Sequence, residues 1–261
     1  MDDPKKRTLC LLVEANGRKG ATVIDRIAED RTFCDHYQLS VVTDGDDGRA
    51  VNIIEKHGLE YTSVDRPEDP AHAIHSISNS TDGLDYLICC GWGYKIPREV
   101  LDIPAESLNC HSSYLPEYRG LSVYRVQWAN AESEGGVSVH RMTEDFDSGE
   151  IVAQQRYSIG LFDTPLSMCR TYAELSASLI RESVFKLDSG YESVEQGIGG
   201  EYYTKLPWWR TILHGVINRA FRGIGSDRRW QVHPTEVKAS SAQTNQKGNY
   251  KEIARGEETN E

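Results

Sequence analysis

Short apolar runs that alternate with amphipathic segments constrain the fold of this chain more than any other feature of its sequence. The first run, TLCLLVE from Thr8 to Glu14, is apolar at nearly every position, as expected for a central parallel strand buried on both faces. Further strands are expected at residues 39–42, 59–64 and 86–90, and helices at 21–28, 50–57 and 71–78. This alternation predicts an α/β fold, in which helices cover a doubly wound, mainly parallel sheet.

The pattern continues to about residue 200 and then changes. A helix is expected at 122–131, two strands at 137–142 and 151–159, and a long helix at 165–186 that Thr164 caps and Pro165 begins. We assign Gly17 and Gly20 to a turn after the first strand, because the complete G-x-G-x-x-G pattern of a dinucleotide-binding loop is absent. We expect a main domain at 1–200, a strand and helix extension at 201–237, and a tail at 238–261 that is disordered because it has few apolar residues.

Charge and cysteine content exclude several classes of protein. The 261 residues carry a formal net charge of −11, and residues 1–200 hold 19 basic and 33 acidic side chains, whereas 201–261 hold 10 and 7. Because nucleic acid requires a cationic surface, we do not expect the main domain to bind it. The six cysteines form no C-x-x-C pair, and neither a signal segment nor a run of the ~20 apolar residues that span a membrane is present. We therefore expect a reduced, cytoplasmic protein.

Three polar residues near predicted strand ends indicate acyl-transfer chemistry. Asn109 and His111, separated by one residue at the end of a strand-like run, project toward the same side of the strand. Asp147 lies 36 residues beyond His111, in a turn between two strand-like runs. Because ligands bind outside the carboxyl ends of strands in open α/β sheets, we expect the Asn109/His111 pair to share one crevice with Gly91, which follows the strand at 86–90. An amide donor, an imidazole and a carboxylate suit proton-coupled acyl transfer better than metal binding.

The order of these motifs resembles the folate-dependent formyltransferases. Residues 109–120 (NCHSSYLPEYRG) carry that family's Asn-x-His-x-Ser-x-Leu-Pro-x-Tyr-Arg-Gly pattern, and a strand and an Asp-x-Gly at 147–149 follow. Residues 90–97 (CGWGYKIP) resemble the segment that lines the pterin pocket of the family. The resemblance spans residues 7 to about 190 and implies a Rossmann-like domain that takes N10-formyltetrahydrofolate as its formyl donor and needs no metal.

The resemblance also implies roles for individual residues. Asn109 would donate a hydrogen bond to the oxyanion of the tetrahedral intermediate, His111 would stabilise it and handle a proton, and Asp147 would orient His111 and take the proton of the amine. We expect the carboxylate to raise the pKa of the imidazole and to favour its cation. The implied donor-binding residues are Gly91, Trp92, Gly93, Tyr94, Ile96, Leu115, Pro116, Tyr118, Arg119 and Gly120.

Each of these residues also has a structural explanation. Asn109 and Asp147 could be a turn former and a cap, and His111 a hydrogen-bonded buried histidine. Trp92 and Tyr94 could equally pack within their own loop, and we expect Arg119 to fix its loop rather than bind an anion. His140 suits a structural role beside the site at least as well as a substrate contact. The ordered coincidence with the family pattern, rather than any single residue, favours the catalytic interpretation.

The resemblance leaves the acceptor amine open. Residues 139–154 look most like the amino-sugar branch, in which a nucleotide-linked 4-amino sugar is the usual acceptor. The tRNA branch carries a large basic C-terminal barrel, for which the 61 residues after position 200 are too few. The glycinamide ribonucleotide branch typically ends where the extension of this chain begins. We therefore expect an amino-sugar N-formyltransferase; phosphoribosylglycinamide formyltransferase of purine synthesis is the alternative, and a non-catalytic folate-binding protein is a further one.

Two other groups of residues could form sites. His72 and His75, at positions i and i+3 of a predicted helix, could be metal ligands, but no carboxylate or cysteine pattern completes a site. Residues 206–222 combine cations with an apolar helical face, made of Trp209, Ile212, Leu213, Val216, Ile217 and Ala220. We expect this helix to pack on the catalytic domain or across a homodimer. The alternative is an interfacial helix that rests on an anionic membrane.

Overall fold

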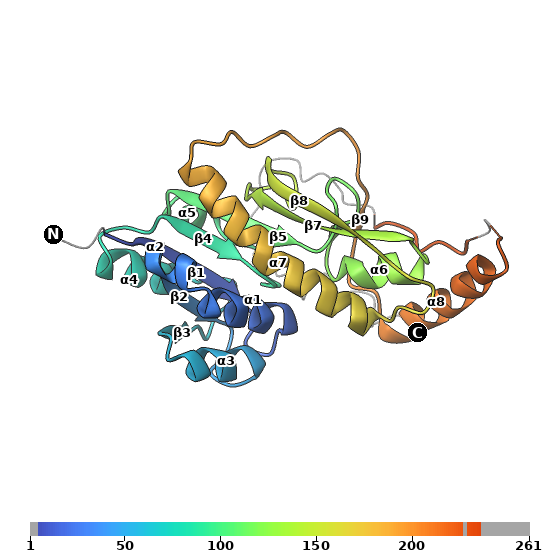
Figure 1. The fold of residues 1–261 in the computed structure, drawn as a ribbon, viewed down its shortest axis with the longest axis horizontal. Coiled ribbons are helices and arrows are strands. Elements are labelled where there is room, and N and C mark those ends of the chain that lie inside the picture. The colour runs from blue at the N-terminus through green and yellow to red at the C-terminus, as the bar shows by residue number, and fades with distance from the viewer. Residues whose placement is uncertain (1–4, 227–228, 236–261) are drawn as a thin grey trace.

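A seven-stranded sheet forms the centre of the computed structural model, which describes residues 5–226 and 229–235 (Figure 1). In order across the sheet, the strands are β3 (Tyr61–Ser63), β2 (Tyr37–Thr43), β1 (Arg7–Val13), β4 (Tyr86–Cys89), β5 (Glu106–His111), β7 (Glu134–Arg141) and β8 (Ile151–Ser158). The first five are parallel, and β7 and β8 continue the sheet in the antiparallel sense. The predicted doubly wound, mainly parallel α/β fold is confirmed.

Helices pack on both faces of the sheet, as the apolar run in β1 requires. Leu9, Leu11 and Val13 point to one face, which is covered by α1 (Arg18–Glu29), α3 (Arg49–His57) and α7 (Pro165–Asp188). Cys10 and Leu12 point to the other face, beneath α4 (Ala71–Ser80) and α5 (Arg98–Leu101). All five side chains are fully buried. Because each buried leucine or valine contributes about 1.5–3 kcal/mol, this strand holds the two layers together.

The helix boundaries agree with the sequence at some ends and differ at others. α7 begins as predicted, because Thr164 and Ser167 exchange side-chain to backbone hydrogen bonds of 3.0 and 3.1 Å and Pro165 opens the first turn. Gly20, however, lies inside α1 rather than in a turn. A Cβ there would lie 2.7 Å from Cβ of Val13, so the glycine allows α1 to approach β1. The short helices α2 (Arg31–His36) and α5 were not predicted.

The segment after residue 200 joins the main domain through a small sheet and a helix. β9 (Tyr202–Tyr203) pairs in parallel with β6 (Arg119–Gly120), directly after the loop that carries the Leu-Pro-x-Tyr-Arg-Gly pattern. A Cβ on Gly120 would lie 2.1 Å from the carbonyl oxygen of Tyr203, so this close pairing requires glycine. α8 (Trp208–Gly223) follows and packs on α6 (Val123–Ala129). In Figure 1, α8 lies at the end of the molecule opposite the N-terminus.

α8 packs on the domain through the face opposite to its apolar one. Its buried residues are Thr211, His214, Gly215 and Asn218. A Cβ on Gly215 would lie 1.9 Å from Cζ3 of Trp128, so the ring of α6 fits against the backbone of α8. The apolar side chains Trp209, Ile212, Leu213 and Val216 are between 42% and 68% exposed. The expectation that this helix packs on the catalytic domain is therefore confirmed, but glycine and polar side chains, rather than the apolar face, make the contact.

Two other expectations concern the membrane and the tail. Within residues 5–226 and 229–235, no helix is long and apolar enough to cross a membrane. The predicted tail at 238–261 lies outside the described residues. The domain limits at 200 and 237 stay predictions.

Candidate active site

The three predicted catalytic residues converge at the carboxyl end of β5. Asn109 and His111 belong to β5, and Asp147 lies in the loop between β7 and β8. β5 pairs antiparallel with β7, which places His140 directly opposite Asn109. The loop after β7 therefore returns Asp147 to the end of β5. The sequence predicted Asn109 and His111 as a pair, and the β5–β7 pairing brings the carboxylate to them.

One carboxylate oxygen joins the polar side chains of the site. Oδ1 of Asp147 accepts a hydrogen bond from Nδ2 of Asn109 at 3.1 Å and lies 3.3 Å from Nδ1 of His111. Nε2 of His140 lies 3.6 Å from the same oxygen and 3.1 Å from Nδ2 of Asn109. The other oxygen, Oδ2, accepts the backbone N–H of Gly120 at 2.8 Å. The carboxylate thus accepts hydrogen bonds from Asn109 and Gly120 and lies beside both imidazoles.

His111 is neutral near pH 7 because it is buried. Nε2 lies 2.9 Å from the carbonyl oxygen of Tyr118, so this nitrogen carries a hydrogen and donates it. Burial lowers the pKa of His111 more than the charge of Asp147 and the Tyr118 carbonyl raise it. Asp147 raises this pKa, as expected, but the expectation that the imidazolium cation is favoured is wrong, since desolvation of a side chain only 7% exposed outweighs the attraction.

Asp147 keeps its negative charge although it is equally buried. Burial by itself would raise its pKa, but the imidazoles of His111 and His140 and the N–H of Gly120 lower it well below its usual range. An ionised Asp147 beside a neutral His111 leaves two proton acceptors, Oδ1 and Nδ1, facing each other. The pair is therefore ready to take up one proton between these atoms.

A large cavity opens over these residues. Its volume is about 760 Å³, within the range of small-molecule sites, and Asn109, His111, His140 and Asp147 all line it. The loop after β4 forms another wall. The predicted donor-binding residues that line the cavity are Gly91, Trp92, Gly93, Tyr94, Ile96 and Gly120. The three predicted catalytic residues and the loop that resembles a pterin pocket thus share one cavity.

The other four predicted donor-binding residues, Leu115, Pro116, Tyr118 and Arg119, lie outside the cavity wall. The side chain of Leu115 is buried, and its N–H donates to Oγ of Ser138 at 3.0 Å. The carbonyl of Tyr118 holds His111, and its ring stacks on Tyr203. In this structure the 115–119 loop therefore positions the imidazole of His111 from outside the cavity.

Arg119 also helps to position the site, through Gln196. Its Nη2 donates to Oε1 of Gln196 at 3.0 Å, and Nε2 of Gln196 donates to the carbonyl oxygens of Asp147 and Gly149 at 3.0 and 2.7 Å. Arg119 therefore connects the 115–120 loop to the turn that carries the carboxylate of Asp147, as expected for a residue that fixes its loop.

Sequence reasoning missed one buried cation beside the site. Lys19, at the start of α1, is 8% exposed, and its Nζ donates to the carbonyl oxygen of Cys110, the residue between Asn109 and His111. The sequence held no signal for this contact, because Lys19 precedes Cys110 by 91 residues and only the β1–β4–β5 order brings them together. His140 holds Nδ1 against the carbonyl oxygen of Arg141 at 2.9 Å, a structural contact, and presents Nε2 to the site.

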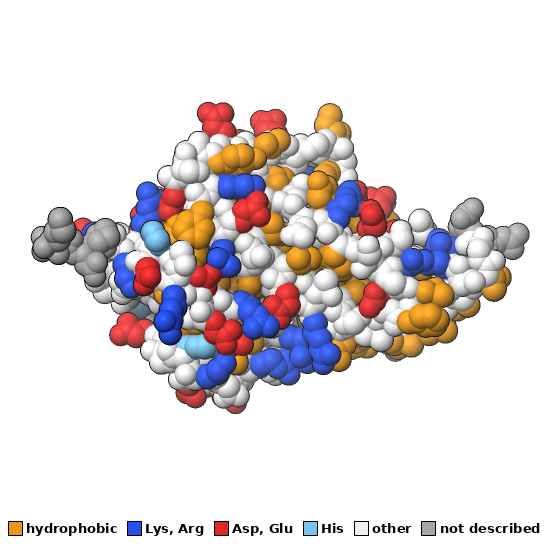
Figure 2. All heavy atoms as spheres, viewed as in Figure 1, with side chains coloured by type: hydrophobic (Ala, Val, Ile, Leu, Met, Phe, Trp, Pro, Cys, Tyr) orange, Lys and Arg blue, Asp and Glu red, His pale blue; other side chains and the backbone are white. Residues whose placement is uncertain are grey.

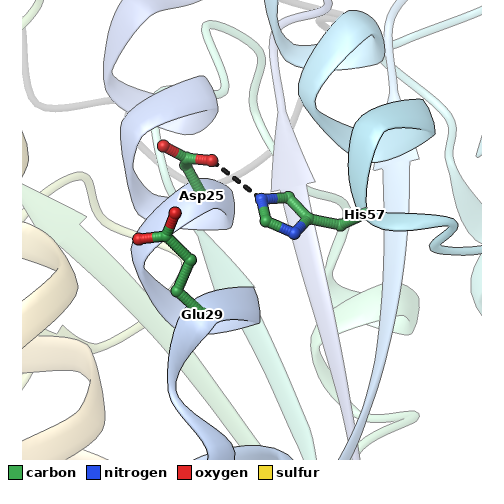
Figure 3. A group of neighbouring side chains, drawn as sticks. All are labelled: Asp25, Glu29 and His57. Carbon is green, nitrogen blue, oxygen red and sulfur yellow. Dashed lines mark hydrogen bonds and ion pairs between the residues drawn. The ribbon is translucent and has the colours of Figure 1, made fainter.

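A group that could hold a metal lies elsewhere. In the part of the chain that the structure describes, Asp25 and Glu29 of α1 and His57 of α3 face one another, whereas His72 and His75 belong to no such group (Figure 3). Nε2 of His57 lies 2.7 Å from Oδ1 of Asp25. Nζ of Lys56 lies 2.8 Å from the same oxygen and 3.8 Å from Oε1 of Glu29. A lysine thus already supplies the cation, and we propose no metal here.

Comparison with known proteins identifies the family. The sequence pattern of the family described as formyl transferase matches residues 12–184. GDP-perosamine N-formyltransferase of Brucella melitensis is 34% identical over 148 residues, which cover 55% of this chain and 54% of that protein. Methionyl-tRNA formyltransferases are also among the curated relatives. The chain spans about half or less of the length of the curated relatives it matches.

Solved structures share the fold at low identity. Glycinamide ribonucleotide transformylase 1 from Symbiobacterium toebii has a TM-score of 0.62 at 18% identity, with 72% of this chain and 90% of that chain covered. The N-formyltransferase from Helicobacter canadensis, in complex with folinic acid and dTDP-3-aminofucose, has a TM-score of 0.56 at 15% identity, with 83% and 82% covered. The family pattern spans the sheet from β1 to α7 and includes Asn109, His111 and Asp147, and the chain therefore belongs to the formyl transferase family.

Proposed function

We propose that this protein transfers the formyl group of N10-formyltetrahydrofolate to the primary amine of a nucleotide-linked amino sugar. The observation that carries the proposal is the convergence of Asn109, His111 and Asp147 on one cavity of about 760 Å³. A protein that only held folate would not need a carboxylate and an imidazole arranged to share a proton. The convergence therefore favours an enzyme over a non-catalytic folate-binding protein.

The proposed reaction needs a proton relay. The amine nitrogen attacks the formyl carbon, the new C–N bond forms, and the bond from that carbon to N10 breaks. The amine loses one proton and N10 gains one, so the overall reaction balances without an oxidant or a metal. The facing acceptors Oδ1 of Asp147 and Nδ1 of His111 would take the first proton, directly or through water. The same pair would return a proton to N10.

Asn109 would polarise the formyl oxygen only after a local rearrangement. Its amide nitrogen lies 3.1 Å from both Asp147 Oδ1 and His140 Nε2, so both amide hydrogens are engaged. One of them would turn to the oxyanion, and Asp147 would keep its bonds to the other and to Gly120. The hydrogen bond from Asn109 to Nε2 of His140 would be the one that breaks.

The cavity wall suits anionic ligands. Its cationic residues outnumber its acidic ones although the chain as a whole is acidic, and they are Arg18, Lys19, Arg49, Lys95, Arg125 and Lys205. The cavity also reaches the N-terminus of α1, where Gly17 provides no side-chain cap for the free N–H groups. Free N–H groups at a helix N-terminus bind phosphate. The start of α1 and Arg49 are therefore the proposed anchor for the acceptor's phosphate.

The residues after position 200 favour a nucleotide-linked acceptor over glycinamide ribonucleotide, the acceptor of the purine-pathway alternative. Lys205 and Trp208 line the cavity although both follow position 200, and the guanidinium of Arg125 lies 4.0 Å from the centre of the Trp208 ring. The similarity to a glycinamide ribonucleotide transformylase favours the purine-pathway alternative. That acceptor has one phosphate and no nucleobase, so it would leave the aromatic wall at Trp208 unused. A nucleotide-linked sugar would use both ends of the cavity.

An acceptor panel tests the proposal. The protein is incubated with N10-formyltetrahydrofolate and, separately, with GDP- and dTDP-linked amino sugars and with glycinamide ribonucleotide, and tetrahydrofolate release is followed. We expect turnover with a nucleotide-linked amino sugar and none in the Asp147→Asn variant. Turnover with glycinamide ribonucleotide alone would replace the acceptor assignment. Folate binding without turnover on any amine would overturn the enzymatic proposal.

A further inference from the structure

The outward face of α8 has the spacing of a helix–helix contact. Trp209, Leu213, Val216, Ala220 and Gly223 follow one another at intervals of four and three residues, and all five are exposed. A 4-3 spacing repeats every seven residues, and two helices with such a stripe can pack along it. The stripe contains no charged residue. It therefore lacks the usual composition of a solvent-facing helix surface.

A neighbouring side chain widens this stripe into a patch. Ile212 is 47% exposed beside Trp209, Leu213 and Val216. At these exposures the four side chains leave on the order of 500 Å² of apolar surface, which is within the range of the largest patches on monomers and more than half of the roughly 800 Å² that each partner contributes to a standard interface. Figure 2 shows hydrophobic side chains gathered over this end of the molecule. The patch is thus large enough for a stable association.

The basic residues of α8 are not arranged to bind a membrane. Arg219 donates to the carbonyl oxygen of Trp128, and Arg222 donates to those of Glu132 and Ile159 at 3.0 and 3.2 Å. Both guanidiniums are therefore held against the main domain by these carbonyl oxygens. An interfacial helix needs cations that flank its apolar face and reach lipid headgroups. Of the three arginines in α8, only Arg210 is left for that role.

The remainder of the chain is also a poor cover for the patch. Residues 236–261 (EVKASSAQTNQKGNYKEIARGEETNE) are mostly polar and contain no apolar stripe of matching spacing. A second copy, by contrast, brings the same uncharged stripe. In a twofold arrangement the two copies of α8 would run antiparallel, so that Val216, at the middle of the stripe, meets Val216 of the second copy near the axis. We infer that the exposed face of α8 is a homodimer interface.

The test measures the mass of the full-length protein by light scattering after size-exclusion chromatography at micromolar concentration. We expect a dimer for the wild type and a monomer for Leu213→Glu, because a buried unpaired carboxylate at this contact is costly. Ile198→Glu is the control, since Ile198 is also an exposed apolar side chain but lies outside α8. It should stay dimeric. A monomeric wild type, or a dimer that Leu213→Glu leaves intact, would overturn the inference.

A second variant keeps the test valid if Leu213→Glu fails to fold. Val216→Cys should form a disulfide between two copies on mild oxidation, seen as a doubled mass on non-reducing electrophoresis, whereas Ile198→Cys should not. Of the native cysteines, all but Cys34 are buried and protected. Absence of the cross-link in folded Val216→Cys contradicts the antiparallel arrangement. Binding of a monomeric wild type to anionic vesicles would assign the face to a membrane instead.

Discussion

At the residue scale, the surroundings of His111 and Asp147 determine the charge state of each side chain. The imidazole is neutral because desolvation lowers its pKa, and the carboxylate is ionised because two imidazoles and the Gly120 N–H lower its pKa despite burial. The result is a base made of two facing acceptors rather than an imidazolium. Removing either acceptor should therefore affect chemistry more than binding.

His111→Ala and Asp147→Asn should each lower kcat by at least ~10²-fold, as expected for positioned proton-transfer groups. The folate dissociation constant, measured by titration with a non-reactive formyl analogue, should change little, since the loop at 91–96 forms a different wall. Turnover near the wild-type rate in either variant would remove that residue from the mechanism.

The protonation of His111 also predicts a pH dependence of folding. Because its folded pKa lies below the ordinary 6.5, the unfolded chain binds a proton near that pH which the folded chain does not. Stability from this group is fully present above pH 6.5 and is lost as the pH falls below it, with a slope of at most about 1.4 kcal/mol per pH unit. Urea unfolding between pH 5 and 8 should show the loss.

Two variants isolate the contribution of His111. His111→Gln should flatten the slope of unfolding free energy against pH in this window, because glutamine does not titrate. His72→Gln, at an exposed position of α4, should leave the slope unchanged. Equal slopes in wild type and His111→Gln would show that His111 has the same pKa in the folded and unfolded chain. Loss of stability from Asp147 follows only at more acidic pH, since its usual pKa is 3.8.

At the scale of elements, α8 docks through its backbone and polar side chains. Asn218 donates to the carbonyl oxygens of Ala129 and Trp230 at 2.7 and 2.9 Å and accepts the N–H of Trp230 at 2.6 Å. Gly215 admits the ring of Trp128, over which Arg219 stacks at 4.2 Å. These contacts explain how an amphipathic helix can bind the domain with its apolar face turned outward.

Two glycines of α8 offer a matched test of this docking. Gly215→Ala should destabilise the protein by about 1–3 kcal/mol, because its Cβ would lie 1.9 Å from Cζ3 of Trp128. Gly223→Ala meets only Cδ2 of Leu161, at 3.6 Å, and should be neutral or stabilising, since alanine favours helix over glycine. The measurement is the midpoint of urea unfolding. Equal effects of the two substitutions would contradict the close packing at Gly215.

At the scale of the whole molecule, the cavity is assembled from both ends of the chain. The start of α1 contributes one wall, the loops after β4 and β7 contribute two more, and Lys205 and Trp208 of the extension complete it. The sheet order brings the first three together, and the β6–β9 pair brings the extension. In the proposed function, acceptor selection would therefore depend on a segment far in sequence from Asn109, His111 and Asp147.

Trp208→Ala should raise KM for the nucleotide-linked sugar by roughly 10-fold, because stacking on one base is worth about 1–3 kcal/mol. The folate dissociation constant should be unchanged. Trp209→Ala is the control, since this neighbouring ring is exposed and lies outside the cavity wall. If both substitutions raise KM equally, the effect comes from α8 as a surface and not from the cavity.

The sequence by itself determined the strand and helix alternation, the cap of α7 and the identity of the three catalytic candidates. These features depend on local patterns: the spacing of apolar residues, the capping residues, and a motif that can be recognised from the order of its residues alone. Only the tertiary structure decided the charge state of His111, the contact of Lys19 with Cys110 and the direction in which α8 faces. Each depends on desolvation or on close packing between segments that are distant in sequence, and such effects leave no periodic signal in the chain.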